Sequence, residues 1–194
     1  MRGPFVAQFP PPGTIAAMPR LAANCSFLFP ERPFLDRFEH AARAGFAAVE
    51  FLFPYAHPAP DIRARLQAHG LRAVLFNTPP GDAAGGERGM ACIPGREAEF
   101  RDGALRALDY AQALGVGNVH VLAGIVPDGV GADAARATYV ANLAFAAARF
   151  AEARVRVLVE PLNRFDAPGY FVNRSAQAIS LIDEIGAANV FLQY

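Results

Sequence analysis

The sequence is poor in several features that identify particular classes of protein. It contains only two cysteines, Cys25 and Cys92, which lie far apart and match no metal-binding or redox spacing. Two free thiols in a reducing cytoplasm is the simplest interpretation. No apolar stretch approaches the roughly 20 residues that a membrane-spanning helix needs, because Gly, Pro, Arg or Asp interrupts every candidate. The sequence therefore predicts a cytoplasmic protein without a membrane partner.

An excess of charge of either sign is also missing. The 194 residues include 18 basic and 18 acidic side chains, and the basic ones are scattered among the acidic ones. Nucleic acids and anionic membranes are bound by clustered Lys and Arg, so this balance argues against both as partners. With 53% hydrophobic and 19% charged residues, the chain has the composition of a soluble globular protein with one sizeable core.

The first 17 residues, MRGPFVAQFPPPGTIAA, differ in composition from the rest of the chain. Arg2 before apolar residues is weakly typical of a signal peptide, but the prolines at 10–12 break the apolar region. We interpret residues 1–17 as a disordered leader or a misassigned start, with Met18 as the first residue of a domain over 18–194.

From Leu21 onward, short apolar runs alternate with longer amphipathic ones, several of which stop at Gly. The apolar runs predict β-strands and the amphipathic ones predict helices. Strands that alternate with helices indicate parallel strands joined by right-handed crossovers. The expected strands span 21–27, 47–53, 71–77, 118–124, 155–160 and 189–194, and the expected helices 34–45, 60–70, 99–115, 133–153 and 175–186.

Two α/β architectures fit this alternation, an open doubly wound sheet and a (β/α)8 TIM barrel. A nucleotide-binding open sheet should show a glycine fingerprint after its first strand, but LFPERP follows LAANCSF without a glycine. An intact barrel has about 250 residues. Five βα units and a sixth strand ending in FLQY would leave an unpaired apolar edge, which natural domains avoid. We therefore expect an incomplete TIM barrel, a fragment of a longer protein.

Functional side chains of such a barrel lie where strands end, on the loops that lead into the helices. Each candidate also has a purely structural alternative. The Asn and Ser side chains could only bond loop backbone, His120 could be a satisfied core histidine, and Glu50 could pair with a nearby Arg. The polar residues at expected strand ends are Asn24, Ser26, Glu50, Asn77, His120, Glu160, Asn163 and Gln193.

Glu160, in the stretch VRVLVEPLNRFDAPGY (155–170), is the candidate that structure alone explains least. A carboxylate at the end of an apolar parallel strand carries a desolvation penalty unless it is paired or coordinates a cation. Pro161 cannot donate a ladder hydrogen bond, so the strand should end there with the carboxylate facing the barrel mouth. This position predicts a functional role.

Six stretches carry a family resemblance: NCSFLFPE (24–31), GFAAVEFLFPY (45–55), NTPPGD (77–82), GERGMACIPGREAEFRDG (86–103), YAQALG (110–115) and VEPLNRFDAPGY (159–170). They resemble the hydroxypyruvate isomerase family, within the group of xylose-isomerase-like barrels, and the likeness runs from about residue 18 to the last residue. The resemblance implies a (β/α)8 barrel that interconverts hydroxypyruvate and tartronate semialdehyde. It matches Glu160 to one of two catalytic glutamates and, in metal-dependent relatives, to a ligand of a divalent cation such as Mg²⁺ or Mn²⁺.

The chemistry of such an isomerase suggests further site residues. A substrate carboxylate needs a cationic or N–H partner, and Arg88 and Arg96 offer bidentate geometry. Both could instead pin their loop to Glu87 or Glu97. Asn77 and His120 are the other expected substrate-binding residues.

The resemblance also implies groups that no residue of this chain matches. They are an Asp directly after the strand-six Gln-Tyr pair, a His or Gln on strand seven and a Glu on strand eight, whereas the sequence ends at Tyr194. We therefore expect the 194-residue chain by itself to be inactive or nearly so.

Three alternatives stay open. A 2-oxo-tetronate isomerase or a ketose 3-epimerase would use the same carboxylates. A non-catalytic half-barrel would bind a partner, or form a homo-oligomer through its strand-six edge. A DNA-repair nuclease on a related barrel fits less well, because it would need several His ligands and a basic face, and the four histidines are not clustered.

Overall fold

The computed structural model describes residues 19–194, so the expected leader over 1–17 and the expected domain start at Met18 lie outside the described residues. Six strands form one parallel sheet in the order β1-β2-β3-β4-β5-β6. A doubly wound sheet reverses its strand order at a switch point, whereas a barrel wall keeps the order of the chain. The sheet is open between β1 and β6. The strands are β1 (Ala23–Asn24), β2 (Ala48–Glu50), β3 (Arg72–Asn77), β4 (Asn118–His120), β5 (Arg156–Val159) and β6 (Val190–Leu192).

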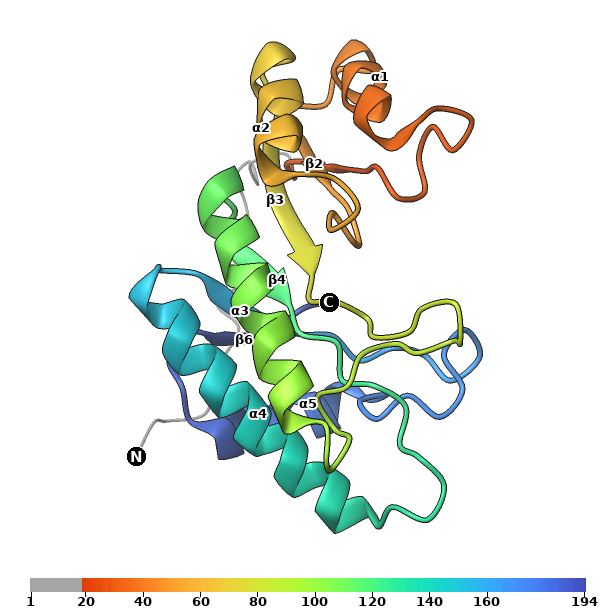
Figure 1. The fold of residues 1–194 in the computed structure, drawn as a ribbon, viewed down its shortest axis with the longest axis vertical. Coiled ribbons are helices and arrows are strands. Elements are labelled where there is room, and N and C mark those ends of the chain that lie inside the picture. Colours follow the sequence, from red (N-terminus) through yellow and green to blue (C-terminus); the bar gives the residue numbers. More distant parts are fainter. Residues whose placement is uncertain (1–18) are drawn as a thin grey trace, which may run out of the picture.

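Helices follow the strands along the chain and each α-helix packs against the next one (Figure 1). The predicted alternation of strands and helices is confirmed. Gly115 and Gly186 cap the third and fifth helices in the left-handed conformation, as the sequence predicts for helix ends. The helices are a short 3₁₀ turn η1 (Phe34–Asp36), α1 (Arg37–Arg43), α2 (Ala59–Ala68), α3 (Glu97–Leu114), α4 (Ala132–Glu152) and α5 (Ser175–Ile185).

The longest helix, α4, shows how the sequence specifies this packing. Its many alanines have high helix propensity, and its larger buried side chains recur along one face, at Tyr139, Leu143 and Phe150. All three are fully buried. This face of the helix thus packs into the core. No helix among residues 19–194 is long and apolar enough to cross a bilayer.

Several strands are shorter than expected because the chain turns early at their C-terminal ends. The first strand ends at Asn24, whose carbonyl oxygen accepts hydrogen bonds from the backbone N–H groups of Phe27 and Leu28 at 3.1 and 2.9 Å. The fourth strand ends at His120, and from Leu122 onward the backbone bonds residues of neighbouring loops, Thr78 Oγ1 among them, instead of extending the ladder. Longer loops therefore surround this end of the sheet, where TIM barrels carry their functional side chains.

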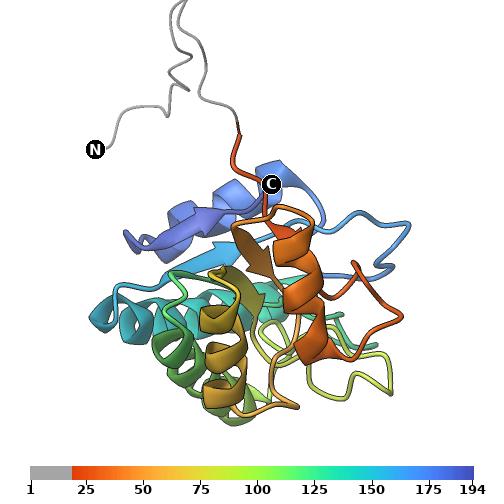
Figure 2. The same ribbon diagram turned by 90° about the horizontal axis from the view of Figure 1, so that it is seen from above.

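The loops that follow β3, β4 and β5 are bonded to one another and extend together to one side of the molecule (Figures 1 and 2). The N–H of Cys92 donates to the carbonyl of Ala123 at 2.8 Å, and the N–H of Phe171 donates to the carbonyl of Gly124 at 2.9 Å. The buried hydroxyl of Tyr170 accepts a hydrogen bond from the N–H of Ala123 at 2.8 Å. These three loops therefore form one connected layer above the strand ends.

Candidate active site

A pocket of about 450 Å³ opens at the C-terminal ends of the strands. Parallel strands end at the same side of the sheet, so side chains that follow different strands converge there. Of the eight strand-end candidates, Ser26 and Asn163 are not among the residues that line it. The other six do line it: Asn24, Glu50, Asn77, His120, Glu160 and Gln193.

Glu50 is held by a neighbouring amide and not by an arginine. The side-chain N–H of Asn24 donates to Glu50 Oε1 at 2.8 Å, and Asn24 Oδ1 accepts the backbone N–H of Ser26 at 3.0 Å. The turn after β1 thereby fixes the direction of the Asn24 amide. Ser26 Oγ accepts the N–H of Leu52 at 2.7 Å and ties this turn to the end of β2. No arginine pairs with Glu50 among the described residues, so the structure does not contain the ion pair that the sequence left open.

Glu160 lies in the same pocket, with 32% of its side chain exposed. Burial raises the pKa of its carboxyl group, and the negative charge of Glu50 raises that pKa further. A carboxyl group whose pKa is shifted toward neutrality exchanges a proton more readily at physiological pH than an ordinary glutamate. The pocket is therefore lined by three carboxylates, those of Glu50, Glu87 and Glu160, and the raised pKa of Glu160 prepares it for proton transfer.

His120 is buried against Glu160, with Nδ1 of the ring 3.3 Å from Glu160 Oε2. Neither ring nitrogen makes an aligned hydrogen bond within residues 19–194. Burial lowers the pKa of the imidazole from its ordinary 6.5 to about 4. His120 is thus a neutral ring with unused polar atoms beside a pocket, which does not match the alternative of a satisfied core histidine.

We expect this histidine to make the fold sensitive to acid. A histidine whose folded-state pKa is lowered contributes stability that is complete above its unfolded-state pKa and is lost as pH falls from 6.5 to about 4. The loss is on the order of 3 kcal/mol, at about 1.4 kcal/mol per pKa unit. The H120N variant should lose less stability than the parent chain between about pH 7 and pH 4 in denaturant unfolding. An NMR titration of the ring with a midpoint near 6.5 would contradict this assignment.

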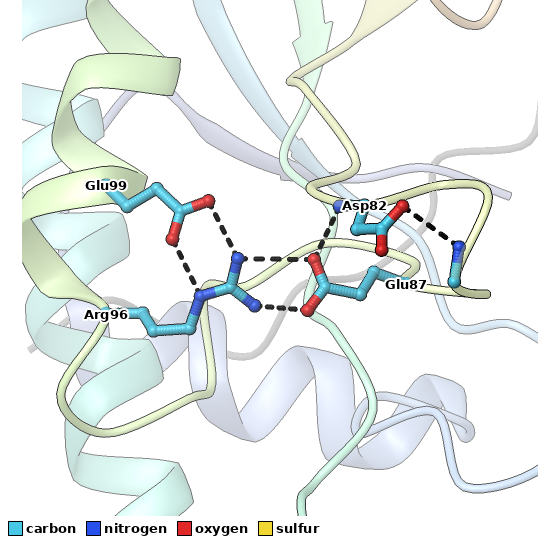
Figure 3. Close-up of polar contacts among 5 residues, drawn as sticks. Asp82, Glu87, Arg96 and Glu99 are labelled. Atoms are coloured by element: carbon cyan, nitrogen blue, oxygen red, sulfur yellow. Dashed lines mark hydrogen bonds and ion pairs between the residues drawn. The ribbon is translucent and has the colours of Figure 1, made fainter.

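The structure separates the two candidate arginines. Arg88 lines the pocket, whereas Arg96 does not. Figure 3 shows the Arg96 guanidinium between two carboxylates. It donates to Glu99 through Nε at 2.8 Å and Nη2 at 2.7 Å, and to Glu87 through Nη2 at 3.2 Å and through Nη1. These contacts match the loop-pinning alternative for Arg96, with Glu87 and Glu99 as its partners. Glu97 instead accepts the backbone N–H of Gly95 at 3.1 Å.

The remaining polar candidates, Asn77, Gln193 and Asn163, differ in their burial and in their hydrogen bonds. Asn77 is buried, and its backbone carbonyl accepts the hydroxyl of Tyr55 at 2.6 Å. The N–H of Gln193 donates to the carbonyl of Val159 at 2.9 Å, while its side-chain oxygen is buried without a partner in the described part of the chain. Asn163 Oδ1 accepts two backbone N–H groups of the turn that follows it. Asn163 therefore shapes a loop and does not face the pocket.

Much of the pocket wall is apolar, and the sequence did not predict this part. Phe27, at 67% exposure, and Phe53, at 38%, are exposed side chains of the lining. A phenylalanine in a loop carries no periodic pattern that would assign it to a site. Its position a few residues after a strand end is the only available indication. The other apolar lining residues include Phe51, Leu52, Leu75, Leu122 and Leu162.

A divalent cation was expected on Glu160, and carboxylate oxygens are suitable ligands for Mg²⁺ or Mn²⁺. Among residues 19–194, no three His, Cys, Asp or Glu side chains come together in a group that could hold a metal ion. The described residues do not by themselves make up a metal centre. Metal ligation by Glu160 stays a prediction.

This chain is similar to a protein family, to individual named proteins and to a crystal structure. Residues 38–194 match the model of the family described as xylose isomerase-like TIM barrel. The chain is 53% identical to the 2-oxo-tetronate isomerase of Cupriavidus necator, over 91% of this chain and 68% of the relative. It is 46% identical to the hydroxypyruvate isomerase of Escherichia coli, over 91% of this chain and 69% of the relative. The crystal structure of an AP endonuclease, family 2, from Brucella melitensis is 49% identical, with a TM-score of 0.88 over 91% of this chain and 68% of that one.

Proposed function

Because this chain belongs to the xylose isomerase-like TIM barrel family, we propose that its pocket isomerises small 2-oxo acids with a hydroxyl group on the neighbouring carbon. The two relatives are named for hydroxypyruvate and for 2-oxo-tetronate, and both acids have this arrangement of groups. The observation that carries the proposal is the pocket itself, in which Glu160, with its raised pKa, faces the same space as Glu50 and Arg88.

Moving a carbonyl to the adjacent carbon requires removal of a proton from the hydroxyl-bearing carbon and return of a proton to the former carbonyl carbon. The hydroxyl proton also passes to the former carbonyl oxygen, so the isomer keeps the same number of protons. We assign the proton transfer to Glu160, which would take the first proton as a carboxylate and act as an acid once protonated. The charge of Glu50 favours the protonated form of Glu160 and so supports this second role.

The intermediate between the two steps is an enediolate, whose negative charge needs hydrogen-bond donors. A neutral His120 has one ring N–H to offer, and the buried Asn77 offers its amide. Arg88 would bind the carboxylate of the acid and thereby set the distance between its reacting carbons and Glu160.

The proposal is tested by binding and by turnover. Isothermal titration of the 194-residue chain with hydroxypyruvate should show binding at the pocket. Turnover should be measured on an extended chain, defined here as this sequence followed by the segment that comes after the matched region in the Cupriavidus necator relative. We expect the extended chain to isomerise hydroxypyruvate or 2-oxo-tetronate and not ketoses such as fructose, because ketoses lack a carboxylate for Arg88. Activity on ketoses alone, or no binding and no turnover, would contradict the proposal.

Removing the cation of Arg88 should weaken the binding of the acid. A hydrogen bond to a charged group contributes about 1.5–3 kcal/mol, so R88Q should raise the Kd of hydroxypyruvate by roughly 10-fold to 100-fold. Arg43 on α1, whose side chain is 76% exposed, provides the matched control R43Q, which should bind like the parent chain. Equal Kd values for R88Q and R43Q would remove Arg88 from the site.

A further inference from the structure

Glu87 and Arg88 are adjacent in the chain, carry opposite charges and both line the pocket. Within residues 19–194, only Glu87 is paired. Glu87 is bonded to Arg96, whereas Arg88 has no ion pair or side-chain hydrogen bond to any other described residue. An ionised carboxylate next to Arg88 is a competitor for any anionic ligand, because it can pair with the same guanidinium.

Arg96, which does not line the pocket, keeps this competitor occupied through its bonds to Glu87 (Figure 3). Its guanidinium bonds both oxygens of Glu87 and both oxygens of Glu99. Glu99 lies in the first turn of α3, so the pair is anchored to a long helix. Bidentate arginine–carboxylate pairs are the strong and directional ones.

The turn that contains Glu87 also holds its carboxylate. The backbone N–H of Asp82 donates to Glu87 Oε2 at 2.6 Å, and the carbonyl of Asp82 accepts the N–H of Glu87 at 2.9 Å. Asp82 Oδ1 in turn accepts the N–H of Gly85 at 3.0 Å. The Arg96 bonds and the hydrogen bond from the Asp82 N–H lower the pKa of Glu87, so it remains ionised and keeps its charge.

We infer that Arg96 is a positioning residue, which sequesters the Glu87 carboxylate so that the Arg88 guanidinium remains free for the carboxylate of the ligand. This inference rests on the proposed function, because it takes an anionic ligand at Arg88 as given. It assigns to Arg96 a role in ligand affinity without contact between Arg96 and the ligand. It also explains why the loop has an arginine at each of these two positions.

The test compares ligands with and without a carboxylate. The 194-residue chain and its variants are titrated with hydroxypyruvate and with dihydroxyacetone, a neutral analogue that has a hydroxymethyl group in place of the carboxylate. R96M should weaken hydroxypyruvate binding by about 10-fold, the loss of one charged hydrogen bond, and leave dihydroxyacetone binding within about twofold. Arg101 on α3, which stacks on Phe145, provides the matched control R101M.

A double variant separates sequestration from a general structural role. In R96M/E87Q the competing carboxylate is absent, so hydroxypyruvate binding should return to within about threefold of the parent value. Weakening of both ligands by R96M, no weakening of either, or no recovery in R96M/E87Q overturns the inference while leaving the proposed function intact. Failure of the parent chain to bind hydroxypyruvate overturns the inference, and only if the extended chain also shows no turnover is the proposed function overturned with it.

Discussion

Replacement of Glu160 by glutamine will lower kcat for hydroxypyruvate isomerisation in the extended chain by about 10³-fold, within the range that general acid–base groups supply. Glutamine keeps the volume of the side chain and one acceptor oxygen but cannot take up a proton. Since the substrate carboxylate is assigned to Arg88, KM should change by no more than about threefold. Steady-state kinetics of E160Q and the parent extended chain provide the measurement.

The matched control is E152Q, which removes an exposed carboxylate of α4 that pairs with Arg149 at the surface. It should leave kcat unchanged. E160Q should also fold at least as stably as the parent chain at about pH 8. A group whose folded-state pKa is raised stabilises the fold at low pH and loses that contribution as pH rises through the folded-state pKa. Glutamine does not titrate, so E160Q does not lose stability in this way as pH rises. A kcat for E160Q within about tenfold of the parent value would contradict the catalytic assignment.

Replacement of Gly89 by alanine will destabilise the fold more than any other glycine-to-alanine change in the pocket loops. The residue has φ of +103°, and an added Cβ would lie 2.4 Å from Leu122 Cβ and 2.5 Å from the Leu122 carbonyl oxygen. Its N–H donates to the carbonyl of Pro80 at 2.8 Å, and the residue bridges to Ala123. Backbone strain and overpacking each contribute about 1–3 kcal/mol, so we expect a loss of about 3 kcal/mol or more.

Gly86 provides the control for this prediction. Its φ is +88°, but a Cβ there would have no atom within 4 Å, so G86A tests the conformational penalty without the clash. Denaturant unfolding should show a loss of about 1–2 kcal/mol for G86A. Because Gly89 follows Arg88 directly, G89A should also weaken hydroxypyruvate binding, whereas G86A should not. Equal losses of stability in the two variants would show that the contact with Leu122 does not constrain this loop.

The order of elements was predictable because it depends on local periodicity and composition. The alanine-rich helix over 133–153, found at Ala132–Glu152, is one example. Strand ends were less predictable: 21–27 reads as apolar throughout, yet the chain turns after Asn24 because the carbonyl of that residue accepts two backbone N–H groups. Such turns depend on local hydrogen bonds that an apolar pattern does not reveal.

The site was predictable to the extent that parallel strands end together. That rule alone brings Glu160, His120 and Asn77 to one pocket. The partner of Glu50 was not predictable, because Asn24 lies 26 residues away in the chain. The roles of Arg88 and Arg96 were equally open, since the direction of a loop side chain depends on tertiary contacts such as those of Glu99. Cytoplasmic location and homo-oligomer formation stay predictions from the sequence.

The assignment of the first proton transfer to Glu160 can be measured alone, by hydrogen exchange. Hydroxypyruvate is incubated in D₂O with the extended chain, and NMR records the loss of its hydroxymethyl protons. We expect exchange well above the protein-free rate with the parent protein, and exchange at the protein-free rate with E160Q. Exchange by E160Q as fast as that of the parent would show that another group removes the proton.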